Sequence, residues 1–426
     1  MPRVLLLATT TGYQTRMFED AARGLGIELV YGTDRCDHLD DPWRDGAIAV
    51  RFHDHDASLA AIDRATVDRP IDGVLGVGDR PAVLASHLQR RLGLPGHPPE
   101  AAATARDKRQ MRACLRAAGL PAPASSLLVP TDDASRLAAQ LAYPVVVKPI
   151  ALSASRGVIR ADDASSFVGA VTRVRRLLAS PDVRARRDDE SGVLQVERYI
   201  DGVEYAVEGL MERGQLRVLA LFDKPDPLVG PFFEETIYVT PSRATADVQE
   251  AIVAQVRASA LAMGLEHGPV HAECRVAPDG VYVLEVAARP VGGLCARALA
   301  FVPTEQAGQR DGRRSLEALL LLHALGEPTH GWTRESVAAG VMMIPVPRAG
   351  IFRDVGGVDA ARAVPGVEDV VMTAKAGQTL VPLPEGASYL GFIFARADEP
   401  GQVEAALRNA HAALHFDVAP SLPIVS

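Results

Sequence analysis

Short apolar runs alternate with amphipathic stretches along the first hundred residues. The apolar runs have the length of strands and predict them at Arg3–Ala8, Gly26–Tyr31, Ala47–Phe52 and Ile71–Val77. The stretches between them have helical spacing and predict helices at Gln14–Leu25, Ser58–Val67 and Arg80–Leu92. Alternation of strand and helix predicts a small parallel α/β sheet covered by helices. A Pro-rich stretch at residues 92–100 then predicts a linker.

The middle of the chain changes from strand–helix alternation to a succession of strands. Helices are predicted at Asp107–Ala118, Asp132–Leu141, Ala164–Leu178, Ala246–Leu265 and Ser315–Leu325. Single strands are predicted at Ser125–Val129 and Pro144–Lys148, and four further strands follow one another within residues 193–240. Four strands in sequence predict one antiparallel sheet. The charged, aperiodic segment 181–191 is expected to form an exposed loop.

A hairpin and a last α+β segment complete the pattern. The hairpin strands are Pro269–Val276 and Val281–Val286, joined by a tight turn. Beyond residue 331 the pattern predicts strands and one helix, at Ala338–Pro347, Val367–Thr373, Ser388–Ala395 and Gln402–Leu414. We therefore expect three parts, at residues 1–98, 99–330 and 331–426.

Composition narrows the class of protein further. The chain has 426 residues and a formal net charge of −8, which argues against a nucleic-acid binder with a basic surface. No apolar run approaches the roughly 18 residues of a membrane-spanning helix, so no membrane partner is expected. Four widely spaced cysteines without a C-x-x-C pair indicate a reduced, cytoplasmic chain without a zinc cluster. The first strand–helix turn lacks G-x-G-x-x-G, which disfavours a nicotinamide-binding enzyme.

The strongest candidate site lies in the hairpin and the residues just after it. His271 and Glu273 share one strand face because side chains alternate, and Glu285 approaches Glu273 when the hairpin pairs about its turn. Adjacent carboxylates repel each other unless a cation lies between them, and Mg²⁺ is the natural candidate. The alternative is a solvated hairpin with ordinary surface charges, which the strongly apolar surrounding strands disfavour.

The segment after the hairpin suits an anionic ligand. Arg289 stands at the strand end, where a guanidinium can bind a phosphoryl group with two hydrogen bonds. Gly292 and Gly293 lack side chains where a ligand would approach the backbone.

A second candidate is the apolar strand that ends at Lys148. It is followed by a loop with Ser153, Ser155 and Gly157. Lys148 can offer a point charge to phosphates, and the hydroxyl and N–H groups of the loop can cover them. The sequence is not a Walker P-loop, because G-x-x-x-x-G-K-[ST] is absent. The alternative is a plain β-hairpin with a polar tip.

A third candidate is the segment QVERYIDGVE. Glu197 ends one strand and Glu204 opens the next. The backbone between Arg198 and Ile200 can form hydrogen bonds with the edge of an adenine base, and Glu204 can accept hydrogen bonds from ribose hydroxyls. The alternative is a hairpin with charged rims.

Taken in order, these motifs resemble those of the ATP-grasp superfamily. The order is Lys108 in a helix, Lys148 in a strand, the Ser/Gly loop, E-x-Y-I-x-G-x-E, and then Glu273, Glu285 and Arg289. The resemblance covers about residues 1–325 and implies the ATP-grasp fold, of class α/β (α+β). An N-terminal parallel α/β domain would precede a core with a lid of antiparallel strands at about 144–206, and a C-terminal α+β module would follow.

The resemblance implies a role for each matching residue. ATP would be bound by Lys108, Lys148, Ser153, Ser155, Gly157, Glu197, Tyr199, Ile200 and Glu204. Two Mg²⁺ (or Mn²⁺) ions would be held by Glu273 and Glu285, and Lys148 and Arg289 would be catalytic. The substrate would contact His271, Arg289, Gly292 and Gly293. The chain departs from the pattern at Ala287, where many relatives have a metal-binding Asn, and at Leu152 and Ala154, where glycines are common.

Within the superfamily, GPVHAECRV and LEVAARPVGG resemble the carboxylate–amine ligases that join amino acids, the L-amino-acid ligases or dipeptide synthases. The resemblance implies an ADP-forming ligase that joins small-molecule carboxylate and amine substrates through an acylphosphate. The alternatives are a biotin-carboxylase-like or purine-pathway enzyme of the same superfamily, and a non-catalytic ATP-binding protein. A homodimer is the default expectation. Lys224 either reaches a phosphate or belongs to a surface turn.

Overall fold

Four parallel strands form the first sheet of the computed structural model, which describes residues 1–9, 14–35, 46–150, 152–185, 187, 192–306 and 312–420. The strand order is β3–β2–β1–β4, with bounds β1 (Arg3–Ala8), β2 (Glu28–Thr33), β3 (Ile48–Ala49) and β4 (Gly73–Val77). Its helices are α1 (Thr15–Leu25), α2 (His55–Thr66) and α3 (Asp79–Leu92). The predicted parallel α/β sheet is confirmed, with β3 shorter than expected.

Alternate residues of β1 pack against opposite layers of this sheet. Leu5 and Leu7 face the layer of α2 and α3. Val4 and Leu6 face α1 and also α10 (Leu316–Ala324), a helix from far along the chain. Because both faces of a parallel sheet are covered, β1 reads as a continuous apolar run. The later part of the chain therefore completes the N-terminal core.

The Pro-rich stretch leads directly into two helices, α4 (Pro99–Arg106) and α5 (Lys108–Ala117). Pro99 occupies the first helical position, where a missing N–H removes no hydrogen bond. The side chain of Asp107 caps α5 by accepting from the N–H groups of Arg109 and Gln110. The linker prediction missed α4, because prolines that start a helix look like turn residues in sequence.

A four-stranded antiparallel sheet follows, in the order β5–β8–β6–β7. Its strands are β5 (Ser125–Leu128), β6 (Val145–Pro149), β7 (Ile159–Ala161) and β8 (Leu194–Arg198). The helix α7 (Ala164–Leu178) packs Phe167, Val171 and Val174 on this sheet, and α6 (Ala134–Ala138) lies beside α7. The expected loop at 181–191 is wrong at its start, where α8 (Pro181–Arg184) forms; residues 186 and 188–191 lie outside the described chain.

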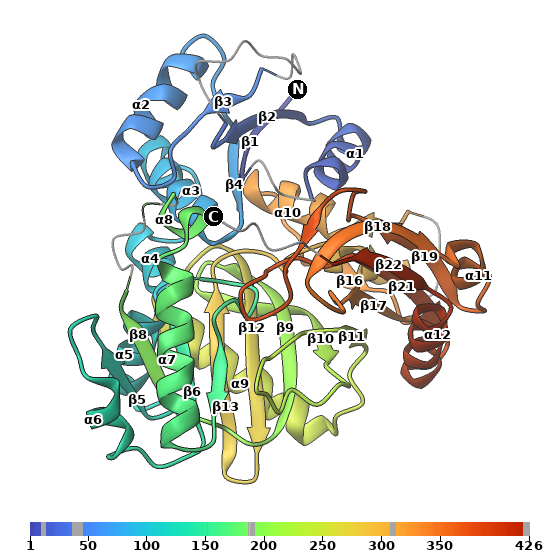
Figure 1. Cartoon of the computed structure of the whole chain (residues 1–426). Helices are drawn as coiled ribbons and strands as arrows, with labels where there is room; N and C mark the ends of the chain where they lie inside the picture. The colour runs from blue at the N-terminus through green and yellow to red at the C-terminus, as the bar shows by residue number, and fades with distance from the viewer. Residues whose placement is uncertain are drawn as a thin grey trace.

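The largest sheet has eight antiparallel strands, in the order β13–β12–β9–β10–β11–β17–β21–β19 (Figure 1). The first five are β13 (Gly280–Ala287), β12 (Gly268–Ala277), β9 (Val203–Glu212), β10 (Gln215–Asp223) and β11 (Ile237–Thr240). The others are β17 (Ala338–Ile344), β21 (Gly391–Ala397) and β19 (Val367–Met372). The prediction that four successive strands form one sheet is wrong, because β8 pairs with β5 and β6 while β9, β10 and β11 belong here.

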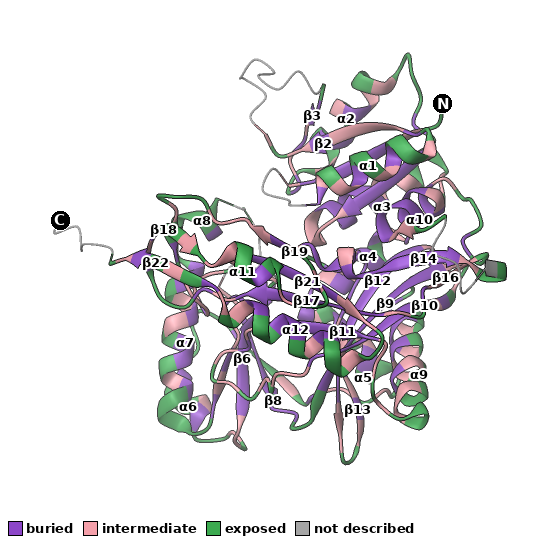
Figure 2. Ribbon diagram, turned by 90° about the vertical axis from the view of Figure 1, so that its right-hand side faces the viewer, coloured by how far each residue is buried: buried purple, intermediate pink, exposed green. Residues whose placement is uncertain are grey.

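Helices cover the eight-stranded sheet at both ends. The helix α9 (Ala246–Ala262) packs Ile252 and Val256 against Val270, Ala272 and Cys274 of β12. The helices α11 (Val358–Arg362) and α12 (Pro400–Ala412) pack on β17, β19 and β21. Figure 2 shows buried residues along the strands and exposed residues on the outer faces of these helices. Because β11 pairs with β17, the sheet continues across residue 330, where we expected a domain limit.

Two small sheets complete the described chain, and neither was predicted. One has the order β15–β14–β16, with β14 (Ala300–Pro303), β15 (Arg314–Ser315) and β16 (Trp332–Arg334). The other has the order β20–β18–β22, with β18 (Gly350–Gly356), β20 (Thr379–Leu380) and β22 (His415–Ala419). Short 3-10 helices occur at Cys295–Ala298 and Thr304–Gln306. Among the described residues, no helix has the length and hydropathy needed to cross a membrane.

A loop between β20 and β21 holds the Ser/Gly loop that follows β6. The N–H of Gly157 donates to the carbonyl of Pro384 at 2.8 Å, and Nε of Arg156 donates to the carbonyl of Glu385 at 2.7 Å. The guanidinium of Arg173, on α7, binds both oxygens of the Glu385 carboxylate at 2.5 and 2.8 Å. The C-terminal strands and the four-stranded sheet are therefore coupled through this contact.

Replacing Glu385 with Gln should loosen this contact without unfolding the protein. The Arg173 and Glu385 side chains are 42% and 38% exposed, so we expect a loss of less than about 1 kcal/mol in the free energy of unfolding. Hydrogen exchange at the Gly157 amide should become several-fold faster. The matched control is Glu368→Gln, which breaks the contact of Glu368 with Arg396 elsewhere. Unchanged exchange at Gly157 in Glu385→Gln would contradict the coupling.

Candidate active site

A cavity of about 540 Å³ lies where the sheets meet, and nearly all of the predicted site residues line it. They are Lys108, Lys148, Ser153, Ser155, Glu197, Tyr199, Ile200, Glu204, His271, Glu273, Glu285, Arg289, Gly292 and Gly293. Gly157 is the exception, since it lies outside the cavity wall and its N–H contacts Pro384 instead. Its φ of +75° favours glycine, which is a structural reason for this residue. The geometry brings the predicted residues together, and their individual roles stay predictions.

The pairing of β9 with β12 places acids opposite bases on one face of the sheet. Glu208 lies opposite His271, and Glu204 lies opposite Arg275. The imidazole Nδ1 of His271 is 3.1 Å from Glu208, and Nε of Arg275 donates to Glu204 at 2.9 Å. Burial alone would lower the pKa of His271, but the two neighbouring carboxylates, Glu208 and Glu273, raise it to about 9. This face of the sheet is therefore charged and buried.

A β-bulge brings Glu285 to the same place. Glu273 pairs with Glu285, whereas Cys274 pairs with Val283, so Leu284 is the extra residue on β13. Residues directly opposite each other in an antiparallel pair point to the same face, with Cβ atoms about 5 Å apart. Without the bulge, Leu284 would lie opposite Glu273 and Glu285 would point into the apolar cluster under α9. The carboxylate pair thus depends on one unpaired residue.

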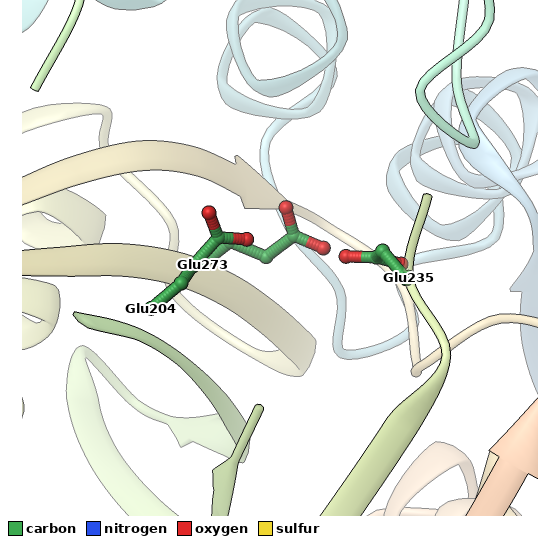
Figure 3. A group of neighbouring side chains, drawn as sticks. All are labelled: Glu204, Glu235 and Glu273. Carbon is green, nitrogen blue, oxygen red and sulfur yellow. The ribbon is translucent and has the colours of Figure 1, made fainter. Parts of the chain in front are cut away.

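Lys224 is a buried cation shared by three carboxylates. Its Nζ lies 2.8 Å from Glu204 and 3.3 Å from Glu273, and it also contacts Glu235. Figure 3 shows these three carboxylates pointing toward one another, and one oxygen of each lies within 4.8 Å of the others. Lys224 is only 5% exposed, so the surface-turn alternative is wrong. These three glutamates could together hold a metal ion, but the ammonium of Lys224 already neutralises part of their negative charge.

Glu197 is shared by two cations in the wall of the cavity. Nε of Arg112 donates to it at 2.7 Å, and Nζ of Lys148 lies 2.5 Å away. Arg112 also donates to the carbonyl of Leu284, at the bulge, at 2.6 Å. Burial alone would raise the pKa of Glu197, but Arg112 and Lys148 outweigh it and lower that pKa to about 2. Because Arg112 neutralises Glu197, the group keeps one net positive charge beside the cavity.

Two further cations face the same space. Nζ of Lys108 donates to the carbonyl of Leu152 at 2.9 Å and lies 3.6 Å from Glu285. Arg289 lies two residues beyond the end of β13, and its Nε donates to Asp79 at 2.6 Å. The cavity therefore holds a pair of carboxylates on β12 and β13 with lysine and arginine side chains around it. Such a set fits a polyphosphate bound with a hard divalent cation.

One region of the cavity wall is less charged than the rest. Tyr238, Cys295, Met343 and Tyr389 line it, and Met343 and Tyr389 come from the C-terminal part of the chain. Glu235 is the acid that borders this region, next to Glu273, and burial together with Glu273 raises its pKa to about 7. This region can hold a small organic molecule that has both apolar and charged groups.

The N-terminal part of the chain contributes Gln14 to the cavity wall. Its Nε2 donates to the carbonyls of Val291 and Gly293 at 2.9 and 2.7 Å, which fixes the glycine segment. Gln14 lies directly before α1, so the first strand–helix turn contributes to the site although it lacks the dinucleotide motif.

Sequence reasoning missed several residues of the site. Glu208 could have been found from the sequence, because it lies four residues after Glu204 in one strand and therefore shares its face. Asp79 could also have been found, because it follows β4 at the carboxyl end of a parallel sheet, where ligands commonly bind. Arg112 and Glu235 had no periodic signal, because only the packing of distant elements brings them to the cavity.

Three family models match this chain. Residues 141–298 match the ATP-grasp domain, residues 18–96 the ATP-grasp N-terminal domain, and residues 342–419 the L-amino acid ligase C-terminal domain 2. The crystal structure of an L-amino acid ligase from Bacillus licheniformis has a TM-score of 0.81 at 26% identity, and the match covers 98% of this chain and 99% of that one.

Two curated ligases are among the relatives of this chain. The alanine–anticapsin ligase of Bacillus subtilis is 29% identical over 216 residues, which are 47% of this chain and 45% of that protein. The D-alanine–D-alanine ligase of Aromatoleum aromaticum is 29% identical over 249 residues, 58% of this chain and 76% of that protein. The match thus spans less than half the length of the alanine–anticapsin ligase.

These findings agree with the geometry of the cavity. The chain belongs to the ATP-grasp superfamily and has its fold. Within that superfamily it resembles the L-amino acid ligases, and it is an ATP-dependent ligase of the class that forms carbon–nitrogen bonds.

Replacing Glu197 with Gln removes the counter-charge of two buried cations. We expect the free energy of unfolding at pH 7 to fall by about 3–5 kcal/mol. The folded-state pKa of about 2 lies below the ordinary value of 4.5, so the stabilisation is present above pH 4.5 and is lost as the pH falls toward 2. Denaturant unfolding of both proteins at pH 7 and pH 3 measures this, and the difference should shrink at pH 3.

The control is Glu317→Gln in α10. Glu317 is also almost fully buried, and among the described residues it has no ion pair. Burial raises the pKa of its carboxyl group, so neutralising it should change stability at pH 7 little or favourably. An equal loss in both variants would show that the ion pairs of Glu197 do not supply the stabilisation.

Proposed function

We propose that this protein joins the carboxyl group of an amino acid to the amino group of a second small molecule, with ATP converted to ADP and phosphate. The observation that carries the proposal is the carboxylate pair of Glu273 and Glu285, which faces Lys108 across one cavity. Lys148 and Arg289 line the same cavity.

The nucleotide would bind between the four-stranded sheet and the hairpin of β12 and β13. Tyr199 and Ile200 line the cavity next to Glu197, where their backbone would contact the adenine. Glu204 would take the ribose, although Arg275 and Lys224 already donate to it. Lys108, Lys148 and the loop with Ser153 and Ser155 would surround the phosphates.

Glu273 and Glu285 fit Mg²⁺ because both are carboxylates, lie opposite each other and face the cavity. Their side chains are 24% and 27% exposed, in contrast to the fully enclosed Glu208. Two ions would bind there. When bound, the metal neutralises phosphate charge and acts as a Lewis acid toward the transferred group.

The proposed reaction has two steps. A carboxylate oxygen of the first substrate forms a bond to the γ-phosphorus of ATP, and the bond to ADP breaks. The nitrogen of the second substrate then forms a bond to the carbonyl carbon of this acylphosphate, phosphate leaves, and the nitrogen loses its proton. Lys148 and Arg289 would stabilise the transferred phosphoryl group, because such transfer needs positioning and charge more than a protein nucleophile.

Exclusion of water is required, since an acylphosphate hydrolyses readily. The loop with Ser153 and Ser155 forms one wall of the cavity, and the contacts of Arg156 and Gly157 with residues 384 and 385 hold it in place. The closed loop would protect the intermediate until the amine attacks.

The cavity wall around Tyr238 and Tyr389 supports amino-acid substrates. Tyr389 and Met343 lie in the segment that matches the L-amino acid ligase C-terminal domain, and both line the cavity. Glu235, whose side chain is 16% exposed, lies in the same region and offers a carboxyl group to a substrate ammonium. This favours an amino-acid ligase over a biotin-carboxylase-like or purine-pathway enzyme, and the complete set of cations and carboxylates favours an enzyme over a non-catalytic ATP-binding protein.

The reaction is tested by measuring ADP release with a panel of amino-acid pairs and identifying the product by mass spectrometry. We expect ADP release to depend on a carboxylate and an amine, and to match amide formed. ADP release that requires bicarbonate would indicate a carboxylase, and ADP release that ignores every carboxylate would contradict the proposal.

Replacing Glu285 with Gln should lower kcat by at least about 100-fold, because the carboxylate pair loses one charge. The unfolding midpoint should stay close to that of the wild type. Glu404→Gln is the control, since Glu404 lies far along the chain on α12 and pairs with Arg243 and Arg408 outside the cavity. Retained activity in Glu285→Gln would remove Glu285 from the site.

A further inference from the structure

We infer that Asp79 is a positioning residue that orients the guanidinium of Arg289 toward the transferred phosphoryl group. Oδ1 of Asp79 accepts from Nε of Arg289 at 2.6 Å, across 210 positions of the chain. The two side chains are 19% and 15% exposed, and both line the cavity. The inference rests on the proposed function only in placing that phosphoryl group beside Arg289.

The contacts of Arg289 fix one side of its guanidinium. Nε is bound to Asp79, and Nη1 donates to the carbonyl of Pro290 at 3.0 Å. Within the part of the chain that the structure describes, Nη2 has no hydrogen-bond partner. A planar guanidinium held at two of its nitrogens cannot rotate freely, and its remaining N–H groups have a fixed direction.

Asp79 is held in place by its own helix and by the turn before it. It is the first residue of α3, and the preceding Gly78 has a φ of +106°, which favours glycine. A Cβ on Gly76 would lie 2.6 Å from the backbone of Ala82, so this turn packs closely against the start of α3. The carboxylate therefore projects from a rigid position.

The charges around Asp79 keep it ionised. Burial alone would raise its pKa, but Arg289, Lys108 and Arg106 outweigh burial and lower it. The N-terminus of α3 also favours a negative charge there. Asp79 thus offsets repulsion between Arg289 and Lys108, which line the same cavity.

The pair also joins two parts of the fold. Asp79 belongs to the N-terminal parallel sheet, whereas Arg289 follows β13 of the eight-stranded sheet. The direction of the Arg289 guanidinium therefore depends on how these parts pack. The opposite role is an inhibitory pair that must break before Arg289 binds phosphate, and the two roles predict opposite effects of removing the carboxylate.

The test compares Asp79→Asn, Asp79→Glu, Arg289→Lys and the double variant Asp79→Asn/Arg289→Lys. The control is Asp56→Asn, another first-turn aspartate on a helix of the N-terminal sheet, which is exposed. For Asp79→Asn we expect kcat to fall about tenfold or more, with KM for ATP changed less than about threefold. Asp79→Glu should recover part of kcat. An increase in kcat would support the inhibitory role and overturn the inference.

The double variant separates positioning from general stability. If Asp79 acts through Arg289, Asp79→Asn should have little further effect on kcat in the Arg289→Lys background. Additive losses would mean that Asp79 acts independently of Arg289, and would overturn the inference. Unfolding midpoints of all variants show whether any loss comes from destabilisation.

A binding measurement is independent of the reaction. Calorimetry with magnesium measures the affinity for ADP and for the non-hydrolysable ATP analogue AMP-PNP. The affinity for AMP-PNP divided by that for ADP reports contacts to the terminal phosphate. We expect this ratio to fall about twofold to threefold in Asp79→Asn and in Arg289→Lys, and to stay unchanged in Asp56→Asn. An unchanged or higher ratio in Asp79→Asn would refute the positioning role. If no amino-acid pair gave ADP, the proposed function would fail while this ratio still tested Asp79.

Discussion

The register of β12 against its two neighbours is the constraint on which the site depends. Its pairing with β9 sets His271 opposite Glu208 and Arg275 opposite Glu204, and the small Ala206 lies opposite Glu273. The one-residue bulge of β13 then sets Glu285 opposite Glu273. A slip of one residue would turn these charges into the apolar cluster under α9. That cluster and the charged cavity therefore fix the register together.

Burying so many charges is unfavourable unless each one has a partner. In this structure, several buried charged groups share one partner of opposite charge. Glu197 forms ion pairs with both Arg112 and Lys148, and Lys224 forms ion pairs with three carboxylates. Because Arg112 and Lys148 share one carboxylate, a net positive charge remains beside the cavity, and the pair with Asp79 fixes the direction of Arg289. Such an arrangement is prepared for a charged ligand, because little reorganisation is needed when phosphates arrive.

Much of the fold and the candidate site could be predicted from the sequence, because those features depend on local periodicity. The parallel sheet followed from apolar runs, and Glu273 and Lys148 were found from their places in strands. The prediction that Glu285 lies near Glu273 was correct, but the bulge at Leu284 that achieves it leaves no mark in the pattern. The membership of β8 in another sheet, and the arrival of Arg112, Asp79 and Glu235 at the cavity, depend on packing between distant elements, which periodicity does not encode.

We propose that one cavity holds the triphosphate and its metal between the lysines and the hairpin of β12 and β13. The most direct test is a crystal structure of the protein with Mn²⁺ and AMP-PNP, in which anomalous scattering locates the metal. The account predicts a metal peak between the carboxylates of Glu273 and Glu285, with the phosphates against Lys108 and Lys148. A nucleotide bound outside this cavity, or a metal held by Glu204 and Glu235 without Glu285, would contradict it.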